Sequence, residues 1–234
     1  MKLSQETQSI LKNFTQINKG IVFHPGNKLY SRKESLIADA TVVEEFEREV
    51  GIHDLNQLLS IIGLYNDPVL DFGEKYLRIA ESDGTAETKY GYAPPGVVSG
   101  GTIPKKKLQE IPDHVIDFTI TEDQWNKLQK AITILSKKEV KIISDGKVVR
   151  IETSDHTKKD SNSFSMVLSA DPHGISCNMV YNRDDMPLLK GSYQGIVTPR
   201  FTLFKNSNGF DLSYFVGIEP TTSTFGATVK ANGQ

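Results

Sequence analysis

The feature that most constrains the fold is a short two-faced helix that the sequence predicts twice. In the first helix, Ser4 is a suitable N-cap, and apolar residues recur at three- and four-residue steps as far as Ile17. In the second, Thr121 and Gln124 form a capping box ahead of a similar apolar face. The two caps are separated by half of the 234-residue length. This spacing indicates an internal duplication and therefore two domains of similar plan.

Both predicted helices carry lysines on the side opposite the apolar residues. An α-helix turns by about 100° per residue, so lysines seven positions apart share one face. A solvated surface is the ordinary explanation of such a face, and a surface for an anionic partner is the alternative. The cations that fit the pattern are Lys12, Lys19, Lys130 and Lys137, with Lys2, Lys127 and Lys138 on the flanks and Arg183 and Lys190 as weaker candidates on a later segment.

Short strand patterns joined by turn residues fill most of the remaining chain, without the crossover spacing of a parallel sheet. The sequence predicts a hairpin around the turn 24–27, another around Asp145-Gly146, a helix from Asp54, and a broken helix over 178–189. Residues 93–112 are rich in proline and glycine and read as a linker. We therefore expect an α+β protein with antiparallel sheets, an amino-terminal domain over 1–108, a carboxy-terminal domain over 109–234, and a frayed tail after Pro220.

Composition limits the function classes. Hydrophobic residues make up 38% of the chain and charged residues 24%, which is typical of a globular protein. No apolar run reaches the roughly 18 residues of a membrane span, and no signal peptide is evident. The single cysteine, Cys177, excludes an internal disulfide and fits a reducing cytoplasm. With a net charge of −2, any DNA-binding surface must gather its positive charge on one side.

Catalytic patterns are weak. Gly146-Lys147 is followed by valine, so there is no Walker A motif, and the five histidines lack metal-ligand spacing. An unrecognised hydrolase would require an acid–base pair that the sequence does not reveal. We expect a protein that is not an enzyme and that needs neither a metal nor another cofactor.

Two segments resemble a known family. The amino terminus (Met1-Lys2-Leu3-Ser4, Thr7, Leu11-Lys12-Asn13-Phe14, Ile17-Asn18, Gly20-Ile21) closely resembles that of the T-even-type bacteriophage DNA polymerase sliding clamp. A second block, Asp54-Leu55-Asn56 with Leu59, Ile62, Leu64 and Asn66-Asp67, is similar to the second helix of that family. The resemblance implies the DNA clamp fold: helices line a central channel, antiparallel sheets lie outside, and three subunits close into a ring around duplex DNA.

The resemblance also implies a function and a set of partners. The protein would tether the replicative DNA polymerase in the cytoplasm of an infected bacterial host, after loading by a clamp-loader ATPase, with late-transcription factors as further clients. Its lysine faces would then line the DNA channel. The family's client-peptide pocket would fall on Ile111, Pro112, Val115, Tyr214, Val216, Ile218 and Pro220, and its subunit interface on Tyr90 and Tyr92 against Phe164, Met166 and Leu168.

A different class of function stays open at this stage. A protein that grips single-stranded DNA by affinity would also present cations, but it would need aromatic side chains stacked along a basic groove. Neither predicted lysine face carries an aromatic residue. The sequence therefore favours a clamp over a single-strand binder.

Overall fold

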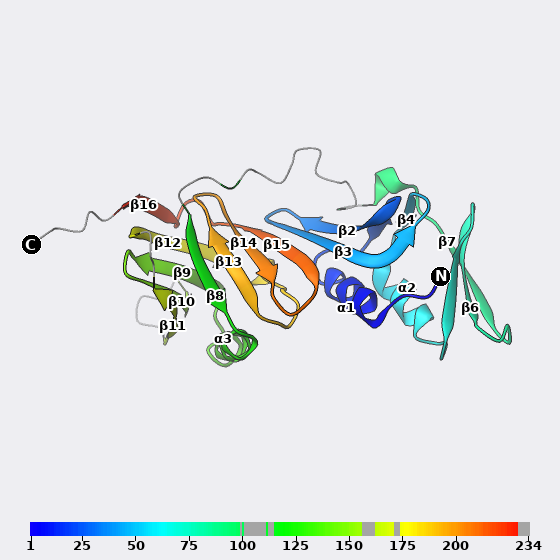
Figure 1. The fold of residues 1–234 in the computed structure, drawn as a ribbon, viewed down its shortest axis with the longest axis horizontal. Helices are drawn as coiled ribbons and strands as arrows, with labels where there is room; N and C mark the ends of the chain where they lie inside the picture. Colours follow the sequence, from blue (N-terminus) through cyan, green and yellow to red (C-terminus); the bar gives the residue numbers. More distant parts are fainter. Residues whose placement is uncertain (99, 101–110, 112–114, 156–161, 171–173, 229–234) are drawn as a thin grey trace, which may run out of the picture. The chain divides into compact units, whose positions relative to one another are not determined.

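A computed structural model describes residues 1–98, 100, 111, 115–155, 162–170 and 174–228 (Figure 1). The chain divides into two compact units. The first comprises Met1–Lys105 with Phe210–Leu212, and the second comprises Lys106–Gly209 with Ser213–Gln234. Within the described residues, helices alternate with antiparallel strands, which confirms the predicted α+β class.

The first unit contains two short helices and three groups of strands. Strand β1 pairs with β4, β2 pairs with β3, and β5, β6 and β7 form a three-stranded sheet in that order. The elements are α1 (Gln5–Phe14), β1 (Ile21–Phe23), β2 (Gly26–Lys33), β3 (Leu36–Phe46), β4 (Val50–Ile52), α2 (Leu55–Ile62), β5 (Pro68–Phe72), β6 (Tyr76–Glu81), β7 (Glu87–Gly91) and a 3-10 turn, η1 (Pro95–Val97).

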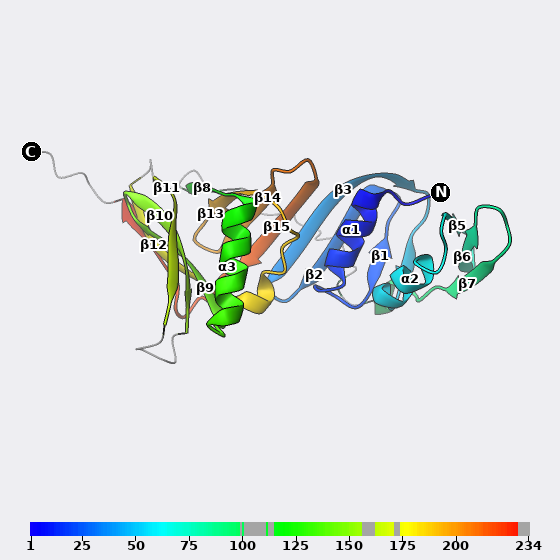
Figure 2. The same cartoon turned by 90° about the horizontal axis from the view of Figure 1, so that it is seen from below.

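Aromatic packing joins the strands of this unit. The rings of Phe23, Phe46 and Phe72 come from β1, β3 and β5 and lie with centroids 4.7 to 5.7 Å apart. Figure 2 shows α1 lying along the β2–β3 pair, where its apolar residues Ile10, Leu11 and Phe14 are fully buried. Burial of these side chains holds α1 on the sheet, since a ten-residue helix is only marginally stable alone.

The second unit contains one longer helix and most of the strands. Its first sheet has the order β11, β10, β9, β12, β16, and its second places β13 between β8 and β14, with β15 next to β14. The elements are β8 (Ile116–Ile120), α3 (Glu122–Ile134), β9 (Glu139–Asp145), β10 (Val148–Ser154), β11 (Phe164–Ala170), β12 (Ile175–Asn182), a 3-10 turn, η2 (Arg183–Asp185), β13 (Tyr193–Val197), β14 (Phe201–Asn206), β15 (Asp211–Gly217) and β16 (Thr224–Thr228).

Aromatic rings also form the core beneath α3. Trp125 of α3 packs against Tyr193 and Phe204, and Phe118 packs edge-on against Phe204. Gly195 makes room for this arrangement, because a Cβ atom at that position would lie about 2.0 Å from the Phe118 ring. The core therefore fixes α3 on the face of β13 and β14 by its apolar side.

Several predicted elements differ from the structure. The hairpin around Asp145-Gly146 is confirmed, with Gly146 at φ 82°. The hairpin around 24–27 is wrong, because β1 pairs with β4 and β2 with β3. The broken helix over 178–189 is also wrong: β12 extends to Asn182 and only the 3-10 turn η2 follows. The tail is not frayed as far as Thr228, because Thr224–Thr228 pairs with β12.

Candidate nucleic-acid interface

Helix α1 presents Lys12 on an exposed face. Ser4 caps the helix through its hydroxyl, which accepts a hydrogen bond of 3.1 Å from the Thr7 amide. The predicted apolar positions are all buried, so the opposite side faces outward. The helix ends at Phe14, which places Lys19 in the following loop and not on the helix as predicted.

Helix α3 presents Lys127 and Lys130 in the same way. The capping box predicted from Thr121 and Gln124 is present, with both reciprocal hydrogen bonds. Trp125 and Leu128 are buried on the inner side, and both lysines are exposed on the outer side. The second unit therefore repeats the arrangement of the first: a capped helix buried by one face with cations on the other.

Lys137 does not belong to this exposed face, and its prediction is wrong. Helix α3 ends at Ile134, and Ser136 adopts a left-handed φ of 50° that redirects the chain. The Lys137 residue is only 4% exposed. The seven-residue spacing would place Lys130 and Lys137 on the same face of a continuous helix. Because the helix ends before Lys137, that lysine does not share the exposed face. Lys138, the next residue, is exposed.

Other predicted cations are exposed but paired with carboxylates. Lys2 lies 2.5 Å from Asp67, and Lys19 lies 3.4 Å from Asp54. The Lys2 ammonium lowers the pKa of Asp67, and the Gln57 amide does the same for Asp54, the N-cap of α2. In the second unit, Lys190 pairs with Glu122 at 3.0 Å and Arg183 with Asp184 at 3.2 Å. These pairs leave less positive charge available to a ligand.

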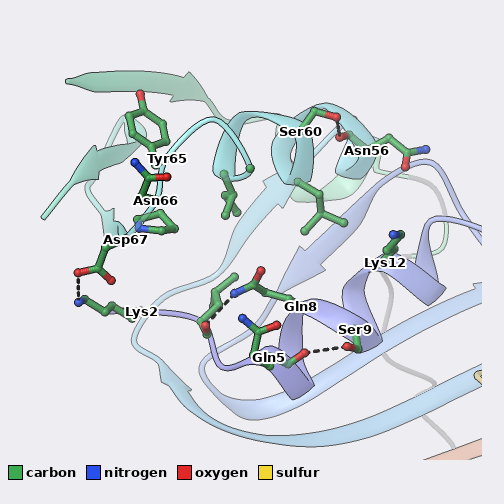
Figure 3. Close-up of a pocket in the computed structure, with 15 residues that line it drawn as sticks. Lys2, Gln5, Gln8, Ser9, Lys12, Asn56, Ser60, Tyr65, Asn66 and Asp67 are labelled. Carbon is green, nitrogen blue, oxygen red and sulfur yellow. Dashed lines mark hydrogen bonds and ion pairs between the residues drawn. The ribbon is translucent and has the colours of Figure 1, made fainter.

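A polar cleft of about 710 Å³ lies between α1 and α2 (Figure 3). Gln5, Gln8 and Ser9 line it from α1, opposite Asn56 and Ser60 of α2. The cleft is also lined by Lys2, Leu3, Lys12, Leu59, Ile62, Gly63, Tyr65, Asn66, Asp67 and Pro68. Amide and hydroxyl groups can donate hydrogen bonds to phosphate oxygens, and Lys12 adds a charge beside them.

The cleft between α1 and α2 was not among the features predicted from the sequence. The signal was present: Gln5, Gln8, Ser9 and Lys12 follow helical spacing and form one polar stripe on α1. What the sequence could not show is that α2 lies beside that stripe.

The residues predicted for the subunit interface lie on two edge strands. In the described part of the chain, β7 pairs only with β6, and β11 pairs only with β10. Tyr90 is buried and donates a hydrogen bond of 3.0 Å to the Asp54 carbonyl, whereas Tyr92 is partly exposed. The three β11 residues Phe164, Met166 and Leu168 are also partly exposed, and Val167 between them is 46% exposed.

The residues predicted for the client pocket do not form one surface. Tyr214 and Val216 are fully buried, so these two belong to the core of the second unit and cannot line an open pocket. The Tyr214 hydroxyl accepts a hydrogen bond of 3.0 Å from the Leu189 amide. Of the others, Ile111 and Pro220 are exposed, Val115 and Ile218 are partly exposed, and Pro112 lies outside the described residues.

The open face of β15 is the one opposite to the predicted residues Tyr214 and Val216. Side chains alternate along a strand, so Phe215 lies opposite Tyr214. There it packs against Phe201 of β14, with ring centroids 5.8 Å apart, and both are partly exposed. Because β15 carries apolar residues on both faces, its sequence alone did not indicate which face is open.

The described residues offer neither a metal-binding cluster nor a membrane-spanning helix. No group of three or more His, Cys, Asp or Glu side chains is placed to hold a metal ion. Among the same residues, no helix combines the length and apolar character needed to cross a membrane.

Comparison with known proteins finds phage sliding clamps. The chain is 28% identical over 207 residues to the sliding clamp of Escherichia phage RB69, covering 83% of this chain and 86% of the relative. It is 26% identical over 205 residues to that of Enterobacteria phage T4, with the same coverage. The sliding clamp of Vibrio phage KVP40 is 22% identical over 227 residues, covering 94% of this chain and 99% of the relative. No family model matches the chain.

Solved structures with a similar fold include two PCNA proteins. Proliferating cellular nuclear antigen from Entamoeba histolytica matches with a TM-score of 0.65 at 10% identity, covering 93% of this chain and 97% of that one. A. fulgidus PCNA bound to the C-terminal region of FEN-1 matches with a TM-score of 0.62 at 15% identity, covering 90% and 94%. The fold and the phage relatives confirm the resemblance seen at the amino terminus: this chain is similar to the sliding clamps of phages RB69, T4 and KVP40 and has the two-domain clamp fold.

Proposed function

We propose that the protein encircles duplex DNA as a closed ring of three subunits and holds the replicative DNA polymerase on its template. The observation that supports the proposal is the repeated helix. In each unit its apolar face is buried and its opposite face exposes lysine, Lys12 in the first unit and Lys127 and Lys130 in the second. Together with the phage relatives, this arrangement fits a channel wall. In this function the protein catalyses no reaction and needs no cofactor.

Lysine suits a wall along which DNA must slide. Its hydrated ammonium group on a flexible stem attracts phosphate without the fixed bidentate geometry of arginine. The exposed faces of α1 and α3 carry lysines and no arginine. Enclosure of the DNA, and not affinity, would keep the clamp in place, which is compatible with the net charge of −2.

The edge strands β7 and β11 support ring formation. An edge strand exposes unpaired backbone groups and is a template for a strand from another chain. In our proposal, β7 of one subunit pairs with β11 of the next, with Tyr92 against Phe164, Met166 and Leu168. Because the two surfaces differ, such a head-to-tail contact closes into a ring if the rotation allows it.

Client proteins would dock on the open face of β14 and β15. In the similar A. fulgidus PCNA structure, the bound partner is the C-terminal region of FEN-1. The partly exposed pair Phe201 and Phe215, near Ile218, is the apolar surface that we assign to a client tail of this clamp. The clients we propose are the DNA polymerase, the clamp-loader ATPase and late-transcription factors, all in the cytoplasm of the infected host.

Retention on circular and linear DNA tests the function. After loading, a ring should remain on a closed circle and leave linear DNA through its free ends, whereas a single-strand binder acting by affinity should not distinguish them. Equal retention on both would contradict the proposal.

Charge reversal tests the assigned wall. Lys12→Glu combined with Lys130→Glu should weaken loading and processive synthesis while the ring still assembles, because both lysines are exposed and neither supports the core. Lys75→Glu combined with Lys147→Glu is the matched control, since both are exposed lysines in turns between strands, one in each unit, and lie outside the helices and the proposed client face. Unchanged DNA retention of the double variant at low salt would show that these lysines do not face the DNA.

A further inference from the structure

We propose that Arg48 and Tyr92 form a buried pair of hydrogen-bond donors that binds an oxygen atom of the neighbouring subunit. This inference rests on the proposed ring and names part of the contact that closes it.

The inference rests on two buried hydrogen-bond donors that lie in one cleft without an acceptor. The Arg48 Nε atom and the Tyr92 hydroxyl are both buried, and neither has a hydrogen-bond partner in the described structure. Both residues line a cleft of about 440 Å³ together with Glu49, Val50, Gly51, Glu74, Ala93 and Pro95. A buried donor without an acceptor is unfavourable, so two of them in one cleft indicate an acceptor that binds there.

The position of the cleft indicates where the acceptor comes from. Tyr92 directly follows β7, the edge strand assigned to the subunit contact. The next residue is held in place, because the Ala93 amide donates a hydrogen bond of 2.9 Å to the Gly51 carbonyl. A strand that adds to the free edge of β7 would therefore continue past the opening of the cleft.

The charges of the cleft favour a neutral oxygen over a carboxylate. Glu49 and Glu74 line it with Arg48. Glu49 is already bound by His24, whose Nδ1 lies 2.9 Å away, but both carboxylates would repel an anion. Burial raises the pKa of Tyr92, so its hydroxyl stays protonated at neutral pH and acts as a donor. An amide or backbone carbonyl oxygen fits this environment best.

The amino-terminal end of β11 in a second copy supplies such an oxygen. Asn162 and Ser163 directly precede β11 and are exposed. Antiparallel strand pairs are the commoner kind. In an antiparallel pairing, the residues before β11 meet the residue after β7. We therefore assign the Asn162 side-chain amide of the neighbouring subunit as the acceptor for Tyr92 and Arg48.

Tyr92→Phe provides the sharpest test, because its effects on folding and assembly should have opposite signs. Removing a hydroxyl that has no partner in the isolated subunit should leave its melting temperature unchanged or raise it. Removing the same hydroxyl from the assembled ring should raise the dissociation constant about tenfold, as expected for the loss of one buried hydrogen bond. Sedimentation across a dilution series measures assembly, and thermal unfolding of the dilute protein measures folding.

Asn162→Ala and the double variant locate the acceptor. If Asn162 binds Tyr92, the double variant should dissociate no more readily than either single variant, which is the non-additivity expected for residues in contact. Arg48→Ala should weaken assembly as well. Arg32→Ala is its control, because Arg32 is an exposed arginine of the same unit on β2.

The outcomes separate this inference from the proposed function. Suppose that the wild type assembles and remains on circular DNA, and that Tyr92→Phe and Arg48→Ala assemble equally well. The proposed role of Arg48 and Tyr92 in the subunit contact would then be wrong, while the proposed clamp function would be supported. Additive effects of Tyr92→Phe and Asn162→Ala would overturn Asn162 as the acceptor. If the wild type stays monomeric at every concentration and leaves circular DNA, the ring and this inference fail together.

Discussion

Glu44 of β3 binds the amino end of α1. Its carboxylate accepts hydrogen bonds from the Ser4 amide and the Thr7 hydroxyl, and the residue is 8% exposed. Burial acts to raise the pKa of Glu44, but these hydrogen bonds outweigh it, and the pKa lies below its ordinary value. The negative charge also lies at the positive end of the α1 dipole. This residue therefore fixes the helix that presents Lys12.

Glu44→Gln should destabilise the first unit by about 2 kcal/mol at neutral pH, because hydrogen bonds to a charged acceptor are stronger than neutral ones. Because the folded-state pKa is lowered, the stabilisation is fully present above the unfolded pKa of about 4.3 and is lost as the pH falls through the folded value. The difference in melting temperature between wild type and variant should accordingly be large at pH 7 and shrink below about pH 4.

A neighbouring glutamate supplies the control for this measurement. Glu45 follows Glu44 in β3 but points to the opposite, exposed side. Glu45→Gln should change the melting temperature little at any of these pH values. If the melting temperature of Glu44→Gln is lower than that of the wild type by the same amount at every pH, the packing of the side chain, and not its charge, accounts for the lost stability.

Helix α3 ends in a Schellman motif built on a serine. The Lys137 amide donates to the Ile132 carbonyl at 3.0 Å, and the Ser136 amide donates to the Thr133 carbonyl at 3.2 Å. Ser136 occupies the left-handed position with φ 50°. Glycine is the usual residue there because it has no Cβ to clash.

Ser136→Gly should therefore stabilise the second unit by about 1 kcal/mol. Chemical denaturation measures the change, and Ser136→Ala is the control because alanine keeps the Cβ penalty. Equal stability of the glycine and alanine variants would mean that the backbone at this position is not strained. Since Lys130 lies six residues before Ser136, neither variant should alter DNA retention.

The same helix ends show where sequence patterns were reliable. N-caps and apolar periodicity predicted α1 and α3 correctly, because both signals depend on residues close in sequence. The hydroxyl groups of Ser4 and Thr121 each accept a hydrogen bond from the amide three residues later. The carboxy-terminal ends were placed too late, and this error assigned Lys19 and Lys137 to helix faces. At these ends the chain turns at residues that are not glycine, so the strongest stop signal was missing.

Strand partners were harder to predict because they depend on distant residues. The β1–β4 pair joins Ile21 to Ile52, whereas the local turn signal favoured pairing β1 with β2. Along β12, which overlaps the start of the segment predicted as a broken helix, Ile175, Cys177, Met179 and Tyr181 are all buried, which is strand periodicity. The alternation of buried positions along β12 is present in the sequence, so this error was avoidable. The Arg48–Tyr92 cleft left no local signal, because its two donors are distant in sequence.

At the scale of the whole molecule, the lysines assigned to the channel wall differ between the two units. In the first unit, Lys2 and Lys19 are bound to Asp67 and Asp54, which leaves Lys12 beside a neutral polar cleft. In the second, Lys127, Lys130 and Lys138 are exposed without a described ion-pair partner. In the proposed ring, the second unit of each subunit would therefore supply most of the unpaired cations assigned to the channel wall. We expect DNA phosphates to contact mainly the second unit.

Two matched double variants test this asymmetry, each removing two lysines per subunit. Lys127→Gln with Lys130→Gln should lower the salt dependence of DNA loading, because each lost phosphate contact reduces the slope of log K against log salt by about 0.9. Lys2→Gln with Lys19→Gln should change that slope by less than half as much, since these lysines must first leave a carboxylate. Both variants should assemble as the wild type does in light scattering. Equal changes in slope would mean that the ion pairs open freely on DNA and that the channel wall is uniform.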